Sequence, residues 1–376
     1  MYLHSIVSGW APSDVVVYTN SRPNQSTFDA SQSYRIIRSR MLWEDFGKPA
    51  QVRMLLTWLL DLLPLLCKER VDIIHAGEAY PSGLVALLLS AVFRRAYVCY
   101  AYGEELNVNL RRKGLLGRLK RCLYRNVIEH AAGLVAVSDY TTSLLVRFGA
   151  DPSRVCKVLP PVLSAKVAPA GEAERTGTRL GLKAEQRVIL AAGRLERRKG
   201  QDVLIRCMPR ILAGAPDAVL VIAGSGPVSD ELLELARTHG ISDRVILTGH
   251  VSDAELSALY DLCVVFAMPH RELPNGDTEG CPTVFLEAGA HGKPVVGGQA
   301  GGASDAILDG HTGIIVDGGK TDEVAAAILR LLGDPGLARR LGESGRERVL
   351  RELSPATAAG RLLAFNQGIM KRRCRA

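Results

Sequence analysis

Short, continuously apolar segments alternate along the chain with longer segments in which apolar residues recur at helical spacing. The short segments predict β-strands and the longer ones helices, because the two structures have different side-chain periods. In the first half, strands are predicted at 13–19, 34–37, 71–76, 96–101, 133–137 and 157–159, and helices at 51–69, 81–93, 115–132 and 139–148. Strands that are apolar throughout are typical of a parallel sheet covered by helices on both faces.

The same alternation begins again in the second half of the chain. Residues 164–178, rich in Ala, Gly, Pro and charge, predict a linker. Strands are then predicted at 188–193, 218–224, 244–249, 262–267, 294–298 and 313–316, and a last helix at about 355–373. We therefore expect two doubly wound α/β domains at 1–163 and 179–353, followed by a C-terminal helix and basic tail at 354–376. Ligands in such sheets bind at the carboxyl ends of the strands, and two domains in tandem place a cleft between them.

Length and composition agree with two globular domains. The chain has 376 residues and 47% hydrophobic residues, enough for two cores. The eight cysteines form no CxxC pair and no metal-ligand spacing, which favours free thiols. The N-terminus lacks the pattern of a signal peptide, and the most apolar stretch, 54–67, is interrupted by Asp61 and Pro64. A cytoplasmic protein, or one peripheral to a membrane, is expected.

Positive charge is concentrated in the first half of the chain. Residues 1–160 hold 20 Lys+Arg and 13 Asp+Glu, a net +7 out of the total +8. Seven of these cations lie in Arg111–Arg125, where Leu115, Leu116 and Leu119 fall at helical spacing. Such a basic amphipathic helix fits an anionic bilayer surface, and a helix packed on its own sheet with a solvated basic face is the alternative. Nucleic acid is a poorer fit, because no aromatic residues interleave the charges.

A pair of acids marks the stretch 277–313. Glu279 and Glu287 stand eight positions apart, and a loop between them becomes a helix expected at 284–290, which Gly292 ends. The N-terminus of that helix suits an anion such as a phosphate, and a carboxylate one turn later can accept hydrogen bonds from ribose hydroxyls. Two solvated surface acids are the alternative, but the apolar neighbours of Glu287 argue against it.

A basic loop follows the first strand of the second half, in the sequence GRLERRKG. Gly193 allows a ligand to approach the backbone closely, while Arg194 and Lys199 can turn toward one anion. Arg197 and Arg198 are expected to be solvated. The Gly-rich turn 224–227 is interpreted as a structural turn rather than as a ligand-binding loop.

These motifs together resemble glycosyltransferase family 4, which has the GT-B fold of two Rossmann-like domains facing each other across a cleft. The resemblance rests on the E-x7-E pair within EGCPTVFLEAGAHGKPVVG and on the upstream segments GRLERRKG and GHVSDAEL, in that family's order. It covers about 180–350 strongly. It covers about 71–160 more weakly, through VDIIHA, AYGEEL and VSDYTTSLL.

The resemblance implies a role for each matching position. Arg194 and Lys199 would hold the diphosphate beside Gly193, Glu287 the ribose and Glu279 the donor sugar, with backbone near Val251 meeting the base. The loop that would touch sugar hydroxyls and phosphate consists of Gly280, Cys281, Pro282 and Thr283. The family transfers a sugar with retention at the anomeric carbon, and it generally needs no metal ion. A nucleotide-diphosphate sugar is the co-substrate, and no further cofactor is expected.

Three departures from the family pattern concern the first half. The strand at 13–19 would be the family's second strand, so the first strand and a Gly-rich loop are expected to be missing, either because the start is misassigned or because the protein is impaired. Tyr102 stands where a His is frequent; its hydroxyl can bind a sugar but is a poor base at neutral pH. Residues 159–163 lack the usual Gly and Asp.

The sequence therefore predicts a retaining, metal-independent hexosyltransferase. It would move mannose or glucose to a glycan or lipid-linked acceptor in cell-surface polysaccharide or glycolipid synthesis, at the inner face of the plasma membrane. The alternative is a catalytically impaired relative that serves as a donor-binding or assembly partner. An epimerase or NAD enzyme fits less well, because no G-x-G-x-x-G follows an early strand.

Overall fold

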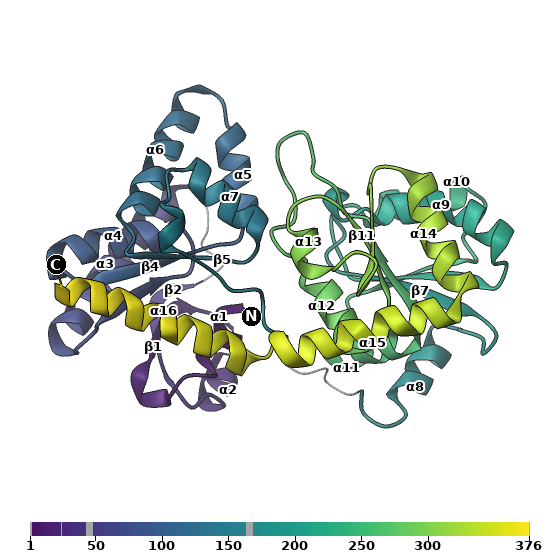
Figure 1. Ribbon diagram of the computed structural model, residues 1–376, viewed down its shortest axis with the longest axis horizontal. Helices are drawn as coiled ribbons and strands as arrows, with labels where there is room; N and C mark the ends of the chain where they lie inside the picture. Colours follow the sequence, from purple (N-terminus) through teal and green to yellow (C-terminus); the bar gives the residue numbers. More distant parts are fainter. Residues whose placement is uncertain (1, 24, 43–47, 163–167, 376) are drawn as a thin grey trace. The chain divides into compact units, whose positions relative to one another are not determined.

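The computed structural model describes residues 2–23, 25–42, 48–162 and 168–375, which form two compact units. The first unit comprises Met1–Pro161 and Pro355–Ala376, and the second comprises Val162–Ser354 (Figure 1). The chain therefore leaves the first unit once and returns to it at its end.

The first unit contains a four-stranded parallel sheet and a separate parallel pair of strands. The sheet has the order β3 (Ile73–Ala76), β4 (Ala96–Ala101), β5 (Gly133–Ala136) and β6 (Val155–Lys157), and the pair joins β1 (Val16–Ser21) to β2 (Arg35–Leu42). The helices are α1 (Tyr2–Val7), α2 (Gln25–Ala30), α3 (Lys48–Lys68), α4 (Ser82–Phe93), α5 (Glu104–Arg111), α6 (Gly114–His130), α7 (Asp139–Arg147) and α16 (Pro355–Arg375).

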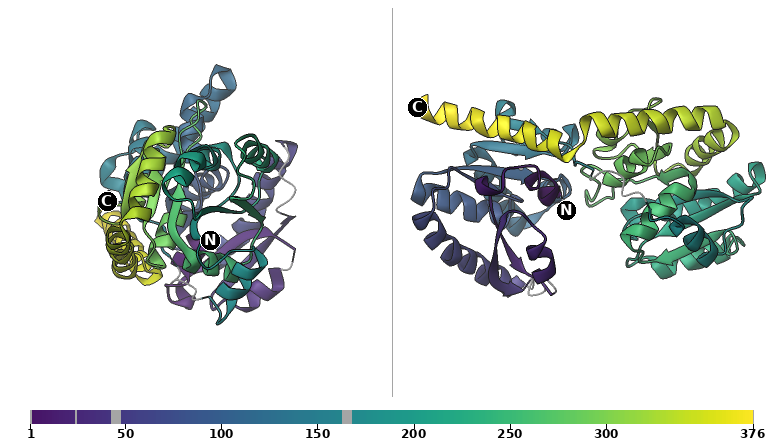
Figure 2. Two further views of the ribbon diagram at one scale, coloured as in Figure 1. Left: turned by 90° about the vertical axis from the view of Figure 1, so that its right-hand side faces the viewer. Right: turned by 90° about the horizontal axis from the view of Figure 1, so that it is seen from below.

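Alternate residues of β4 build the two cores of this unit. Tyr97 and Cys99 pack with residues of α4, α6 and α7, whereas Val98 and Tyr100 pack with α1 and α16 on the other face. Both helices α1 and α16 lie side by side over that face (Figure 2). The indole Nε1 of Trp10 donates to the carbonyl oxygen of Ala359 at 3.2 Å. The C-terminal helix is thus a layer of the first unit and not the separate tail that the sequence suggested.

The second unit is a six-stranded parallel sheet covered by helices. Its strand order is β12 (Gly313–Val316), β11 (Val295–Gly298), β10 (Cys263–Met268), β7 (Arg187–Ala192), β8 (Ala218–Ala223) and β9 (Val245–Gly249). The order runs outward in both directions from β7 and β10, so the topological switch point lies between their carboxyl ends. The helices are α8 (Glu172–Arg179), α9 (Gln201–Gly214), α10 (Ser229–Thr238), α11 (Asp253–Leu262), α12 (Thr283–Ala290), α13 (Ala303–Ala306), α14 (Thr321–Gly333) and α15 (Pro335–Glu352).

Several element boundaries differ from the sequence prediction. Strand β6 ends at Lys157, so the strand predicted at 157–159 is misplaced. The first predicted strand begins later, at Val16, because Pro12–Asp14 forms a 3-10 turn. The predicted linker 164–178 contains most of α8, which packs on α11; its residues 164–167 lie outside the described residues. Among the residues that the structure describes, no helix is both long and apolar enough to cross a membrane.

Candidate functional site

Three loops meet backbone to backbone at the carboxyl edge of the second unit's sheet. A Cβ added to Gly200 (φ +76°), after the β7 loop, would lie 2.2 Å from the carbonyl oxygen of Pro269, which follows β10. A Cβ added to Gly298, at the end of β11, would lie 1.8 Å from the carbonyl oxygen of His270. Side chains other than hydrogen do not fit at these contacts, so the glycines allow the loops to assemble one rigid platform at the switch point.

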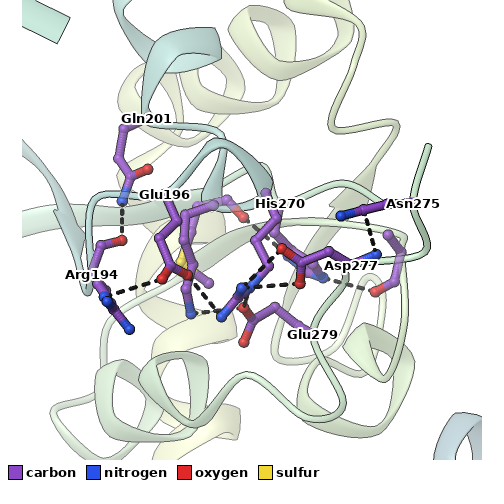
Figure 3. A network of polar contacts seen from close by, with 11 residues as sticks. Arg194, Glu196, Gln201, His270, Asn275, Asp277 and Glu279 are labelled. Carbon is purple, nitrogen blue, oxygen red and sulfur yellow. Dashed lines mark hydrogen bonds and ion pairs between the residues drawn. The ribbon is translucent and has the colours of Figure 1, made fainter. Parts of the chain in front are cut away.

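A network of ion pairs joins two of these loops. The Nε of Arg198 donates to Oε1 of Glu279 at 2.7 Å, and its NH1 donates to the two carboxylate oxygens of Asp277 at 3.0 and 3.1 Å. Its NH2 forms an ion pair with Oε2 of Glu196 at 2.8 Å. The Nζ of Lys199 lies 2.9 Å from the same Oε1 of Glu279. Figure 3 shows this network, with the carboxylates of Glu196, Asp277 and Glu279 turned toward the side-chain nitrogen atoms that they contact.

These cations decide the charge of Glu279. Burial by itself would raise the pKa of this carboxyl group, since the charged form loses its hydration. The ammonium of Lys199 and the guanidinium of Arg198 outweigh that effect, and the pKa lies below its ordinary value. Glu279 is therefore a carboxylate at neutral pH, with one oxygen held by both cations.

Glu287 lies in the opposite electrostatic situation. It belongs to α12, one turn beyond the first helical residue Thr283, and the hydroxyl of Tyr260 donates to its Oε2 at 3.0 Å. Burial raises its pKa, and hydrogen bonds from Tyr260 and Thr283 counteract only part of that rise. A carboxylate in this position gains from further hydroxyl donors, which is what a ribose would supply.

Further predicted donor residues lie in the loops that follow β7 and β9 of the same unit. The side chain of Arg194 is 71% exposed and pairs with Glu196 at 3.1 Å, so most of its guanidinium is open to solvent. Gly193 has a φ of +144°, and a Cβ there would meet nothing within 4 Å. Val251 follows β9 and precedes Ser252, which caps α11 in a capping box with Glu255.

The loop from Gly280 to Thr283 leads directly into α12. Gly280 and Pro282 are buried, Cys281 is half-buried and Thr283 is exposed. The carbonyl oxygen of Glu279 accepts from the backbone N–H of Gly302 at 3.0 Å, which fixes the start of this loop. The first turn of α12 consequently opens beside the two acids, with its N–H groups available for an anion.

Tyr102 belongs to the first unit and is not among the residues that the second unit brings together. Its ring lies edge-on to Tyr2 at 5.7 Å, and its backbone N–H donates to Oε1 of Glu105 at 3.0 Å. Burial raises the pKa of its phenol well above the ordinary range. The hydroxyl is therefore neutral at physiological pH and can serve as a hydrogen-bond partner but not as a base.

One prediction about the basic loop is wrong. Arg198 was expected to be solvated, but its side chain is only 14% exposed and contacts three carboxylates. Arg197 is exposed and pairs with Glu231 at 2.7 Å, as expected. Arg197 and Arg198 are adjacent and of the same residue type, so no local spacing rule distinguishes them. Two of the acids that contact Arg198, Asp277 and Glu279, lie some eighty positions further along the chain.

Comparison with known families agrees with the two-unit architecture. The model described as "Glycosyl transferases group 1" matches residues 174–348, and the model described as "Glycosyl transferase 4-like domain" matches residues 1–161. The matched regions correspond to the second unit and to most of the first.

Characterised relatives cover most of the chain. The GDP-mannose-dependent alpha-(1-6)-phosphatidylinositol monomannoside mannosyltransferase of Mycolicibacterium smegmatis is 34% identical over 308 residues, which span 81% of this chain and 78% of that protein. The enzyme of the same name from Mycobacterium tuberculosis is 32% identical over 363 residues, spanning 94% of this chain and 89% of that protein.

Solved structures share the fold at lower identity. Anabaena Alr3699/HepE in complex with UDP superposes with a TM-score of 0.79 at 17% identity, covering 97% of this chain and 95% of that one. Sucrose-phosphate synthase from Thermosynechococcus elongatus gives a TM-score of 0.81 at 22% identity, covering 99% and 93%. The predicted α/β class and GT-B fold are thereby confirmed.

Proposed function

This chain belongs to glycosyltransferase family 4, and from that premise we propose that it transfers mannose from GDP-mannose to a glycolipid acceptor. As a member of that family it is a glycosyltransferase that uses a nucleotide sugar. The choice of GDP-mannose is supported by the printed activity of the two mycobacterial relatives, which are 34% and 32% identical. The observation that carries the proposal is the platform at the switch point, which brings Lys199 to Glu279 and places Glu287 one turn into α12.

The proposed reaction uses these groups in distinct roles. Lys199, Arg194 and the first amides of α12 neutralise the diphosphate as the bond between its oxygen and the anomeric carbon breaks. The acceptor hydroxyl oxygen bonds to that carbon on the same face, which retains the configuration, and its proton passes to the departing phosphate oxygen. Glu287 holds the ribose and Glu279 orients the sugar. No metal ion and no additional cofactor is required in this proposal, because the cations supply the positive charge.

Donor binding tests the assignment of Glu287. Calorimetric titration with GDP, UDP and ADP is expected to show a preference for GDP. Glu287→Ala should weaken binding by roughly tenfold or more, because a buried carboxylate that accepts hydroxyl bonds contributes on the order of 1.5–3 kcal/mol. Equal affinity in wild type and variant would refute the role.

Turnover separates the enzyme from the impaired relative. A hydrolysis screen across GDP-mannose, UDP-glucose and N-acetyl sugar nucleotides should show turnover of GDP-mannose that is insensitive to EDTA. When a glycolipid acceptor is supplied, NMR of the mannosylated acceptor should show an α-linkage, the configuration of the donor. A protein that binds GDP but turns over no sugar nucleotide would instead be the donor-binding partner.

The proposed lipid acceptor is supported by an exposed apolar and basic surface at residues 111–121. These residues comprise the end of α5, the short connection and the first turns of α6, and we call them the α6 tip. Leu115, Leu116 and Leu119 are 82%, 81% and 67% exposed. The first turns of α6 stand at an end of the unit in Figure 1. The surrounding cations Arg111, Arg112, Lys113, Arg118, Lys120 and Arg121 are unaccompanied by any acid in this segment.

Such a tip matches the interface of an anionic bilayer, where leucines enter the headgroup region and cations attract the lipid phosphates. We place the protein peripherally on the inner face of the plasma membrane. Flotation with vesicles of neutral or anionic lipid should show binding to the anionic ones, and Leu115→Ser with Leu116→Ser should abolish it. Leu350→Ser, at an exposed leucine of α15, is the matched control. Flotation that does not depend on anionic lipid would contradict the proposal.

A further inference from the structure

Binding of a diphosphate would take Lys199 away from Glu279. This inference rests on the proposed function. In the structure, Lys199 contacts Oε1 of Glu279 at 2.9 Å. The proposed reaction requires the same ammonium at the diphosphate. If Lys199 were the sole partner of Glu279, its departure would leave a mostly buried carboxylate without compensation, since the side chain of Glu279 is only 12% exposed. Removing one partner of a buried pair is costly.

Arg198 is placed to remove this conflict. Its Nε donates to the same Oε1 at 2.7 Å, so Glu279 keeps a cation when Lys199 moves. Its other nitrogens contact Asp277 and Glu196, which fix the plane of the guanidinium. The backbone carbonyl oxygen of Arg198 also accepts from the N–H of Arg271 at 2.8 Å, and Arg271 pairs with Asp202 of α9 at 3.0 Å. Three side-chain contacts and a tied backbone hold Arg198 where it stands.

We propose that Arg198 is a positioning residue that keeps Glu279 ionised and oriented toward the donor sugar while Lys199 transfers from Glu279 to the diphosphate. Arg198 itself touches neither sugar nor phosphate. Since both cations occupy Oε1, the second oxygen of Glu279 is the one that accepts from sugar hydroxyls. Lys199 is thereby a mobile cation and Arg198 a fixed one, although the two are adjacent in sequence.

These separate roles of Arg198 and Lys199 predict how many protons the protein takes up when the donor binds. With Arg198 present, Glu279 remains a carboxylate throughout, and binding takes up no proton at pH 7. In Arg198→Gln, the departure of Lys199 leaves Glu279 with burial as its main influence, and burial raises a carboxyl pKa. The carboxylate then takes up a proton as the donor binds. A loss of packing or loop order alone would weaken binding without this uptake.

The test is calorimetric titration of GDP-mannose at pH 7 in two buffers of different ionisation enthalpy. GDP-mannose suits it because both phosphates are diesters and carry no proton that titrates near neutrality. Arg198→Gln should bind roughly 10- to 100-fold more weakly and take up a measurable fraction of a proton. Arg198→Lys should recover part of the affinity and take up a smaller fraction of a proton. Arg197→Gln, at the exposed neighbour, should behave as wild type.

Two results would overturn the proposal: a normal affinity in Arg198→Gln, or a weaker one with no difference between buffers. Proton uptake by the wild type would overturn it as well. Failure of the proposed donor would look different, because the wild type would then bind UDP-glucose and not GDP-mannose, and the same comparison would be made with UDP-glucose. A wild type that binds neither overturns both proposals. Should Arg198→Gln fail to fold, Arg198→Lys must still show intermediate uptake.

Discussion

The carboxyl edges of the two sheets carry acids in opposite states. In the second unit, Glu279 lies between two cations, which lower its pKa. In the first unit, Glu78 follows β3 and Glu105 follows β4, the neighbouring strand. Burial, and then repulsion from Glu105, raises the pKa of Glu78 to about 7, and burial raises that of Glu105. Glu279 is thus held ionised at one edge, unlike Glu287 in α12, whereas Glu78 and Glu105 at the other edge both have a raised pKa.

This difference follows from what surrounds each edge, and it suggests what each edge binds. An edge that combines cationic side chains with a helix N-terminus suits an anion, which fits a nucleotide diphosphate. An edge with the neutral phenol of Tyr102 and two carboxyl groups of raised pKa suits hydroxyl partners better than an anion, which fits an uncharged sugar or polyol. Three variants can break or sharpen this comparison.

Removal of the mobile cation at the second unit's edge should have the largest effect. Lys199→Ala is expected to lower kcat for GDP-mannose turnover by roughly 100- to 1000-fold, because the departing diphosphate loses a preorganised charge. Steady-state kinetics measures it. Lys320→Ala, an exposed lysine paired with Glu323 at 2.9 Å, is the control and should leave kcat unchanged. A loss of less than about tenfold would show that the anion site lies elsewhere.

At the first unit's edge, the raised pKa of Glu78 should appear as pH-dependent stability. The carboxyl group of Glu78 keeps its proton up to about pH 7 in the folded state, whereas the unfolded chain loses it near the ordinary glutamate pKa of 4.5. The free energy of unfolding should therefore fall as pH rises between these values and stay level above pH 7. Glu78→Gln should remove this fall, so that urea unfolding at pH 8 shows a variant more stable by on the order of 2 kcal/mol.

The exposed Asp72→Asn is the control for this measurement, and it should shift the unfolding curves equally at every pH. If Glu78→Gln does the same, the carboxyl group of Glu78 titrates normally, and the two edges do not differ in the way described.

Loss of one neutral hydroxyl should have the smallest effect. Tyr102→Phe is expected to lower sugar transfer by about tenfold, the value of one hydrogen bond, because the phenol serves as a hydrogen-bond partner and not as a base. Affinity for GDP should be unchanged, since Tyr102 lies in the other unit from the donor residues. A thousandfold loss, or a bell-shaped pH profile that disappears in the variant, would instead make Tyr102 an acid or base.

Much of the fold was predictable because local patterns carry it. β4 and β12 have the predicted bounds of 96–101 and 313–316, since their residues are apolar throughout and flanked by polar turns. Ser138 stands directly before α7, and its side chain accepts from the N–H of Thr141 as a serine at a helix N-cap does. α5 was missed: its eight residues, Glu104–Arg111, carry few apolar positions, and its start is set by the turn at Gly103.

The candidate site was predictable where one short stretch contains both partners. Glu279, Glu287 and the N-terminus of α12 lie within a dozen residues, and their order along the chain gives a loop, a helix start and a carboxylate one turn later. The contact of Tyr260 with Glu287 was not predictable, because these residues come from different helices.

The sequence by itself determined two α/β units, the positions of most strands and the residue types at the donor edge, because side-chain periodicity and turn chemistry act over a few residues. Only the contacts of the folded chain place α16 on the first unit and hold Arg198, but not Arg197, among three carboxylates with 14% of its side chain exposed. Both depend on contacts between segments far apart in the chain: α16 covers a sheet face formed before residue 160, and Arg198 meets carboxylates some eighty residues away. Local patterns do not encode such pairings; they arise when β7 and β10 pair at the switch point and bring their loops together.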